Sequence, residues 1–115
     1  MKKTNIQVNM STKTVNISVA GKMTLEDAKL FVSEYNRKMS QINGADYVLE
    51  VDCKEMQVLT PEMTEDLTGV MKMYKSTGFK EVIFQIKSNT ILKMQLSRIV
   101  RNAALSQGTV VEVAQ

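Results

Sequence analysis

The stretch that decides the fold runs from Tyr47 to Thr64, YVLEVDCKEMQVLTPEMT. Residues 47–52 predict an alternating strand, residues 53–59 a short loop, and Thr60 the cap of a helix with Pro61 in its first turn. Proline fits there because its missing N–H is one that the helix cannot pair internally, and the Thr60 hydroxyl can accept a remaining free donor. Partners and ligands of α/β folds tend to bind where a strand leads into a helix N-terminus, so we expect the functional surface here.

The N-terminal part of the chain predicts a hairpin followed by a helix. Ile6–Val8 and Val15–Val19 alternate apolar and polar residues around a polar turn at residues 10–13, which is typical of an antiparallel hairpin at a sheet edge. A helix is then expected from a Thr24 cap to Asn43-Gly44. Its expected inward stripe is Leu25, Ala28, Val32, Tyr35, Met39 and Ile42.

The C-terminal part predicts two more helices and two more strands. The helix that begins at Thr60 should end at Thr77-Gly78, and the nearly continuous hydrophobic run at residues 82–86 predicts a strand covered on both faces. A third helix should end near Gln107-Gly108, before a closing strand at residues 109–113. The residues expected to point inward are Met63, Leu67, Val70, Met71 and Tyr74 on the second helix, and Leu92, Leu96, Ile99 and Ala103 on the third.

The resulting order is β-β-α-β-α-β-α-β, without a linker or repeat, and it indicates one domain spanning residues 1–115. Strands that alternate with single helices favour right-handed crossovers and a largely parallel sheet. With the initial hairpin, we expect an α/β fold with a mixed sheet of about five strands and three helices.

The amino-acid composition limits the kinds of chemical site that the chain can form. The chain has no histidine and a single cysteine, so we expect no internal disulfide, no metal site, no cofactor and no histidine-dependent catalysis. Cys53 is expected to be a small half-buried residue near a strand end, with a reactive thiol as the alternative. The nine methionines either fill gaps in the core or line an adaptable binding surface. No segment predicts a membrane span or signal peptide, which favours a cytoplasmic location.

Two segments resemble the STAS domain, which anti-sigma-factor antagonists share with the cytoplasmic tails of sulphate transporters. Residues 19–24, VAGKMT, resemble the second strand of that family, which ends in glycine before a capped helix. Residues 48–52, the seven-residue loop and Thr60 onward resemble its central strand, terminal aspartate and switch-bearing helix start. The resemblance covers almost the whole chain and implies a non-enzymatic module that docks a protein partner. It implies docking through residues 53–64, with contacts from Met23, Asp52, Thr60, Glu62, Met63 and Thr64.

The family signature at this helix start is an aspartate, two serines and a glycine, and a partner kinase phosphorylates the second serine. The four matching positions here are Thr60, Pro61, Glu62 and Met63, so none of the four is retained. Glu62 either supplies a fixed negative charge in place of the phosphate or simply stabilises the first helical turn. Thr60 and Thr64 remain as candidate phosphorylation sites. The simpler interpretation makes Thr60 a cap and Thr64 a solvent-facing residue, and we predict no serine-type switch.

Charge is distributed unevenly along the chain. Residues 50–66 hold six acids and one base, whereas residues 87–101 hold four bases and no acid. This asymmetry would steer charged partners. Arg98 and Arg101 are three residues apart on the third helix and could together bind an anion, with a solvated outer face as the simpler alternative. Scarce aromatic residues and a net charge of only +3 argue against nucleic acid as a partner.

Three classes of function remain open. The first is the docking module, whose partner would be an anti-sigma factor or a kinase-like regulator, and which is compatible with a homodimer. The second is a small-ligand or lipid sensor, which an apolar pocket between sheet and helices would favour. The third is an enzyme using Asp52, Glu55 and Glu62 as acid and base, for which the sequence shows no convergence of the carboxylates.

Overall fold

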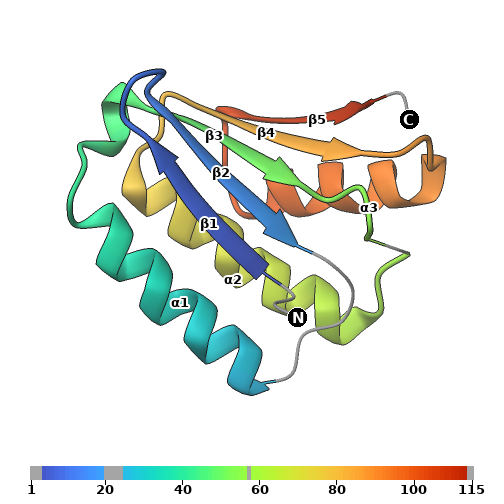
Figure 1. Ribbon diagram of the computed structural model, residues 1–115. Helices are drawn as coiled ribbons and strands as arrows, with labels where there is room; N and C mark the ends of the chain where they lie inside the picture. Colours follow the sequence, from blue (N-terminus) through green and yellow to red (C-terminus); the bar gives the residue numbers. More distant parts are fainter. Residues whose placement is uncertain (1–3, 20–24, 57, 114–115) are drawn as a thin grey trace.

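A five-stranded sheet with the strand order β1-β2-β3-β4-β5 forms the centre of the molecule (Figure 1). The computed structural model describes residues 4–19, 25–56 and 58–113. The helices and strands are β1 (Thr4–Asn9), β2 (Thr14–Val19), α1 (Leu25–Met39), the short 3₁₀ helix η1 (Gly44–Asp46), β3 (Val48–Asp52), α2 (Pro61–Thr77), β4 (Glu81–Ile86), α3 (Thr90–Asn102) and β5 (Gly108–Glu112).

The predicted mixed α/β class, with five strands and three helices, is confirmed. β1 and β2 form the expected antiparallel hairpin, in which Ile6 pairs with Ile17, and β1 lies at the edge of the sheet. β2 to β5 pair in parallel. The 3₁₀ turn η1 was not expected from the sequence. The predicted Thr24 cap lies outside the described residues.

All three helices lie on the same face of the sheet (Figure 1). Each crossover moves one strand further in the same direction, and right-handed crossovers that always move in one direction place their helices on one side. The burial of β3 agrees with this arrangement: Leu49 and Val51 are buried, whereas Glu50 between them is half-buried. In the part of the chain that the structure describes, no helix covers the opposite face.

The expectation that residues 82–86 form a strand covered on both faces is wrong. Val82, Phe84 and Ile86 point into the core, but Ile83 and Gln85 alternate with them and are only half-buried. Ile83 pairs with Glu50 on one side and Thr109 on the other. A β-branched side chain between two strand neighbours is favourable even on a face that is not fully covered. The isoleucine at position 83 is therefore explained by contacts with the neighbouring strands, and it does not require a layer of helices on that face.

A chain of aromatic rings joins α1 and α2 to the sheet. The centroids of Phe31 and Tyr35 on α1 are 6.1 Å apart, Tyr35 lies 5.7 Å from Tyr74 on α2, and Tyr74 lies 6.3 Å from Phe84 on β4. The Tyr35 hydroxyl and Thr77 Oγ1 share a hydrogen bond of 2.5 Å, and Thr77 Oγ1 also lies 3.1 Å from the Met73 carbonyl, to which it can donate. The rings of Tyr35 and Tyr74 and the Tyr35–Thr77 hydrogen bond therefore join α1 to α2.

Helix α1 differs from the prediction in its end and in its buried stripe: it ends at Met39, before the predicted Asn43-Gly44, so Ile42 lies outside it. Val32, predicted to face inward, is 38% exposed, and Phe31 is buried in its place. Phe31, Tyr35 and Met39 recur at steps of four and point at the sheet, which rotates the buried face by one residue from the predicted one. On α3 the four predicted inward residues are all buried, but the helix ends at Asn102. It ends early because Ala104 adopts a left-handed conformation, with φ of 56°, that cannot continue a helix.

Lys38 closes the outer edge of the hairpin. Its ammonium group donates to the Ile6 carbonyl on β1 at 2.6 Å and lies 3.9 Å from Glu34. A lysine bonded to an edge strand blocks the pairing of that edge with another chain. Within the described residues, no helix combines the length and hydrophobicity that crossing a membrane requires.

We predict that Gly44→Ala destabilises the protein by about 1–3 kcal/mol, the usual range for overpacking a filled site. A Cβ atom at Gly44 would lie 2.5 Å from the Thr77 carbonyl oxygen and 2.8 Å from Thr77 Cγ2, where η1 meets the end of α2. Denaturant unfolding measures the change. The matched control is Gly69→Ala on the exposed side of α2, where a Cβ meets nothing within 4 Å.

The control should stabilise the protein by about 0.5–1 kcal/mol, because alanine is the better helix former. Equal effects of the two substitutions would contradict the packing argument.

Candidate functional site

The start of α2 has the cap geometry that the sequence predicts. Thr60 is extended, with φ of −83° and ψ of 164°, and its Oγ1 accepts a hydrogen bond from the Met63 N–H at 3.2 Å. Pro61 occupies the first turn, and Glu62 lies beside it in full contact with solvent. The carboxylate of Glu62 thus stands at the positive end of the helix dipole, where a negative charge is favourable.

Thr64 differs from its expected role as a solvent-facing residue. Its Oγ1 donates to the Thr60 carbonyl at 3.0 Å, and the Thr68 hydroxyl donates to the Thr64 carbonyl at 2.8 Å. Both candidate phosphorylation sites therefore have hydroxyls that already bond the backbone of the first turns. A kinase would have to break these hydrogen bonds to reach either oxygen.

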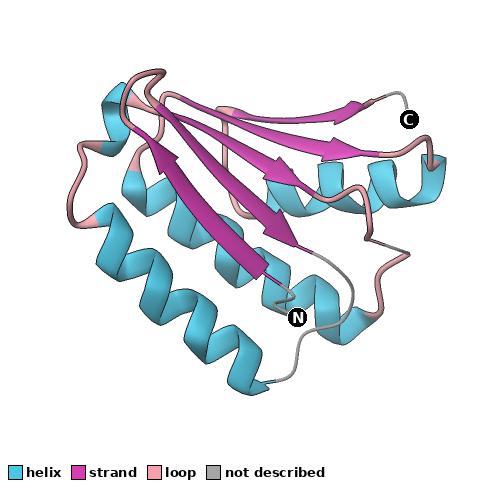
Figure 2. Cartoon of the chain, in the orientation of Figure 1, coloured by secondary structure: helices cyan, strands magenta, loops and turns pink. Residues whose placement is uncertain are grey.

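The loop between β3 and α2 leaves the carboxyl end of β3 (Figure 2), and buried apolar side chains anchor it. Cys53, Met56 and Leu59 are all buried in the core, while Glu55 and Val58 are exposed. Cys53 is 2% exposed, so the expectation of a half-buried cysteine is wrong. It is buried because its N–H continues the ladder of the sheet, bonding the Gln85 carbonyl at 2.8 Å, and the side chain stays on the covered side.

Gln95 on α3 fixes the other end of the loop. Its Oε1 accepts from the Leu59 N–H at 2.8 Å, and its Nε2 donates to the Leu59 carbonyl at 3.1 Å. The amide thereby satisfies both backbone groups of the residue that precedes the Thr60 cap. The loop, the start of α2 and the first half of α3 consequently form one connected surface.

Three exposed apolar side chains of this region were not singled out from the sequence. Val58 is 48% exposed, and Ile91 and Met94 on α3 are 59% and 64% exposed. The signal available in the sequence was their position outside the buried stripe of α3. Ile91 directly precedes Leu92 and Met94 lies between Leu92 and Leu96, so both point away from the side of the helix that carries Leu92, Leu96 and Ile99.

The other residues predicted to contact a partner differ in how accessible the structure leaves them. Met63 is half-buried and packs against the core, so only part of it can meet a partner. Asp52 is held by Lys54, whose N–H bonds Asp52 Oδ1 at 3.0 Å and whose ammonium lies 3.7 Å from Oδ2. Met23 lies outside the described residues.

The two arginines predicted to bind an anion together do not line one common hollow. Arg98 and Arg101 are both exposed, and Arg101 borders a shallow groove with Ser97, Ala104 and Ser106 that does not include Arg98. Nowhere in residues 4–19, 25–56 and 58–113 do three Cys, Asp or Glu side chains group closely enough to hold a metal ion.

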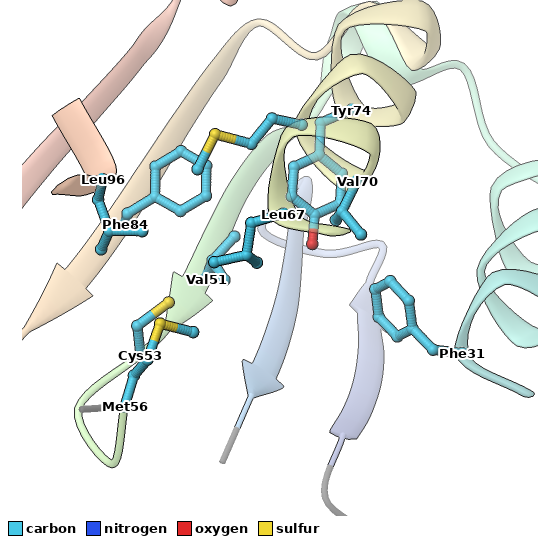
Figure 3. Close-up of a pocket in the computed structure, with 10 residues that line it drawn as sticks. Phe31, Val51, Cys53, Met56, Leu67, Val70, Tyr74, Phe84 and Leu96 are labelled. Atoms are coloured by element: carbon cyan, nitrogen blue, oxygen red, sulfur yellow. The ribbon is translucent and has the colours of Figure 1, made fainter. Parts of the chain in front are cut away.

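A small apolar cavity lies beneath α2. Its volume is about 20 Å³, and it is bounded by side chains of all three helices and the sheet (Figure 3). The hydroxyl of Tyr74 points into the space between Leu67 and Phe31, and Cys53 and Met56 close another side. A volume of this size is near the roughly 10–15 Å³ that one water requires, so the cavity is too small for a lipid headgroup unless its walls move.

Burial makes the ionisable groups of the core hard to ionise. Desolvation, with a smaller contribution from Asp52, raises the pKa of the Cys53 thiol to about 12. Desolvation likewise raises the pKa of Tyr35 to about 12, although the Thr77 hydrogen bond opposes it, and raises that of Tyr74 well above its ordinary value. At neutral pH Cys53 is a thiol and not a nucleophilic thiolate, which argues against the reactive alternative.

We predict that Gln95→Leu loosens the loop and destabilises the protein by about 1–3 kcal/mol, because the Leu59 N–H and carbonyl lose their partners. Hydrogen exchange at Leu59 should accelerate more than exchange within β3. Gln107→Leu is the control, since Gln107 Nε2 bonds only the Phe79 carbonyl, at 3.3 Å, away from this loop. Unchanged Leu59 exchange in Gln95→Leu would contradict the assigned role.

We predict that the contribution of Cys53 and Tyr35 to stability is constant from neutral pH to about pH 9 and falls as the pH rises toward 12. The ordinary pKa values of 9.0 for cysteine and 10.0 for tyrosine apply to the unfolded chain, whereas Cys53 and Tyr35 ionise only near 12 in the folded protein. The unfolded state therefore loses protons first, and this favours unfolding in that window. Urea unfolding at a series of pH values measures the effect, and the fall should begin nearer pH 10 in Cys53→Ala. Stability that stays constant through this window would contradict the assignment.

A scan against protein-family models gave no match for this chain, and a search of curated proteins found no relative.

Proposed function

We propose that the chain is a non-enzymatic regulatory module of the STAS type that docks a protein partner through residues 53–64. The observation that carries this proposal is the anchored loop and capped helix start, which hold Glu55, Val58 and Glu62 exposed on a rigid base. A surface that is ordered before binding loses little conformational entropy when a partner docks. The partner would be an anti-sigma factor or a kinase-like regulator, and a homodimer is compatible with the same surface.

In this proposal the interaction is not switched at the helix start. The position that matches the phosphorylated serine is Glu62, an exposed carboxylate with a permanent charge. The hydroxyls of Thr60 and Thr64 are engaged by the first turns of α2. Control of the complex would then depend on the amount or state of the partner.

We predict that affinity capture from the native lysate recovers one dominant protein with the wild-type chain and loses it with Glu62→Lys. Reversal of an exposed charge in a docking surface slows association and repels a complementary partner. Glu26→Lys is the matched control, because Glu26 is also an exposed acid in the first turn of a helix, at the start of α1. Quantitative mass spectrometry measures the recovered protein.

Equal capture by the wild type and Glu62→Lys would contradict docking at this position. The same experiment should detect no phospho-Thr60 or phospho-Thr64 on the native protein, and either modification would contradict the proposed lack of a switch.

A small-ligand sensor remains the second candidate, and the apolar cavity is the observation that favours it. Leu67 and Val70 on α2 are only half-buried, so their outward movement would be the route to a larger site. Native mass spectrometry of the gently purified protein tests this candidate. A bound small molecule that is lost in Val70→Trp, which fills the cavity, would favour sensing over docking.

A further inference from the structure

The exposed apolar side chains Val58, Ile91 and Met94 come from the loop before α2 and from the first turns of α3, and the first two turns of α2 carry the exposed acids Glu62 and Glu65. We call Val58, Ile91, Met94, Glu62 and Glu65 the rim surface. Val58 directly precedes Leu59, whose backbone bonds Gln95 at 2.8 and 3.1 Å, and Ile91 is one turn before Gln95 on the same side of α3. Met94, three residues after Ile91, extends the apolar area toward solvent.

The orientation of α3 follows from two contacts. Gln95 bonds the loop that leads into α2, so the side of α3 that carries Ile91, Gln95 and Arg98 faces α2. Lys93 lies 3.7 Å from Glu112 on β5, so the opposite side faces the edge of the sheet.

The orientation of α2 follows in the same way. Thr77 bonds Tyr35 of α1, so the side of α2 that carries Met73 and Thr77 faces α1. The opposite side carries Pro61, Glu65 and Thr68, at steps of four and three, and faces α3. Since α2 and α3 pack against each other, Glu65 borders the apolar area formed by Val58 and Ile91.

The charges on this surface are unbalanced. Glu62 and Glu65 are exposed, and neither has an ion pair with another described residue. Arg98 is exposed at the α3 margin of the same surface. An apolar area that contains the flexible Met94 side chain, beside unpaired acids, complements apolar side chains that are flanked by lysine or arginine.

We propose that the rim surface binds a cationic amphipathic helix of a partner protein. Apolar anchors of that helix would cover Ile91, Met94 and Val58, its basic side chains would lie over Glu62 and Glu65, and Arg98 would set its direction by pairing with an acid at one end. Helix recognition of this kind reads apolar anchors at steps of three and four. The inference rests on the proposed docking function and specifies the chemistry of the partner.

Two synthetic helical peptides test the proposal. They share one leucine stripe, and their polar faces consist of lysine in one and glutamate in the other. Fluorescence anisotropy should give at least about tenfold tighter binding of the lysine peptide to the wild-type chain, and added salt should reduce this difference. Backbone NMR shifts should change at Val58, Ile91 and Met94.

Four variants locate the site. Ile91→Ser with Met94→Ser should weaken binding of the lysine peptide by about tenfold or more, since both side chains would be interface anchors. Leu30→Ser is the matched control, because Leu30 is 70% exposed on α1, away from this surface. Glu62→Lys with Glu65→Lys should invert the preference in favour of the glutamate peptide, whereas Glu26→Lys should leave it unchanged. All substituted side chains are exposed, so circular dichroism should show an unaltered fold.

Equal affinity for the two peptides, no binding at about millimolar concentration, or NMR shifts confined to another surface would overturn the proposal. So would weakening by Leu30→Ser as large as that by the double serine variant. If a native partner is lost with Glu62→Lys but kept with the double serine variant, docking stands and the cationic helix is refuted. If the peptides behave as expected and no native partner depends on Glu62, the docking function fails instead.

Discussion

The constraint on which the rest of the molecule depends is the strand order of the sheet, in which each strand lies beside the one that precedes it in the chain. Because β2, β3, β4 and β5 follow one another as neighbours in parallel, their right-handed crossovers place α1, α2 and α3 on one face. A single layer of side chains between helices and sheet then forms the core, with the rings of Tyr35 and Tyr74 near its middle. The carboxyl ends of the parallel strands meet at one edge, where the loop and helix start of the candidate site lie.

Packing at that edge is the basis on which we propose recognition of a partner there. The cysteine of the loop is buried and protonated, the threonines at the helix start bond the backbone, and Asp52 is held by Lys54. What remains exposed is a set of carboxylates and apolar side chains on a base fixed by Gln95. Such a surface can select a partner by shape and charge.

Local signals were sufficient for much of this structure. Thr60 and Pro61 predicted the start of α2, Gly78 its end, and the stripe of Leu92, Leu96 and Ile99 the buried side of α3. These features depend on cap hydrogen bonds, on φ preferences and on periodicity, all of which act within a few residues. The position of the candidate site followed from the same signals, but its exposed apolar contacts did not.

The sequence by itself determined which residues form strands and helices and where α2 begins, since those choices depend on neighbours along the chain. Tertiary structure decided that one sheet face stays free of helices in the described part of the chain, that Phe31 rather than Val32 is buried, and that Gln95 bonds Leu59, 36 positions away in the sequence. The physical reason is that periodicity identifies which side chains share a face, whereas burial depends on what packs against that face. That neighbour is set by strand order and crossover direction, which no short stretch of sequence contains.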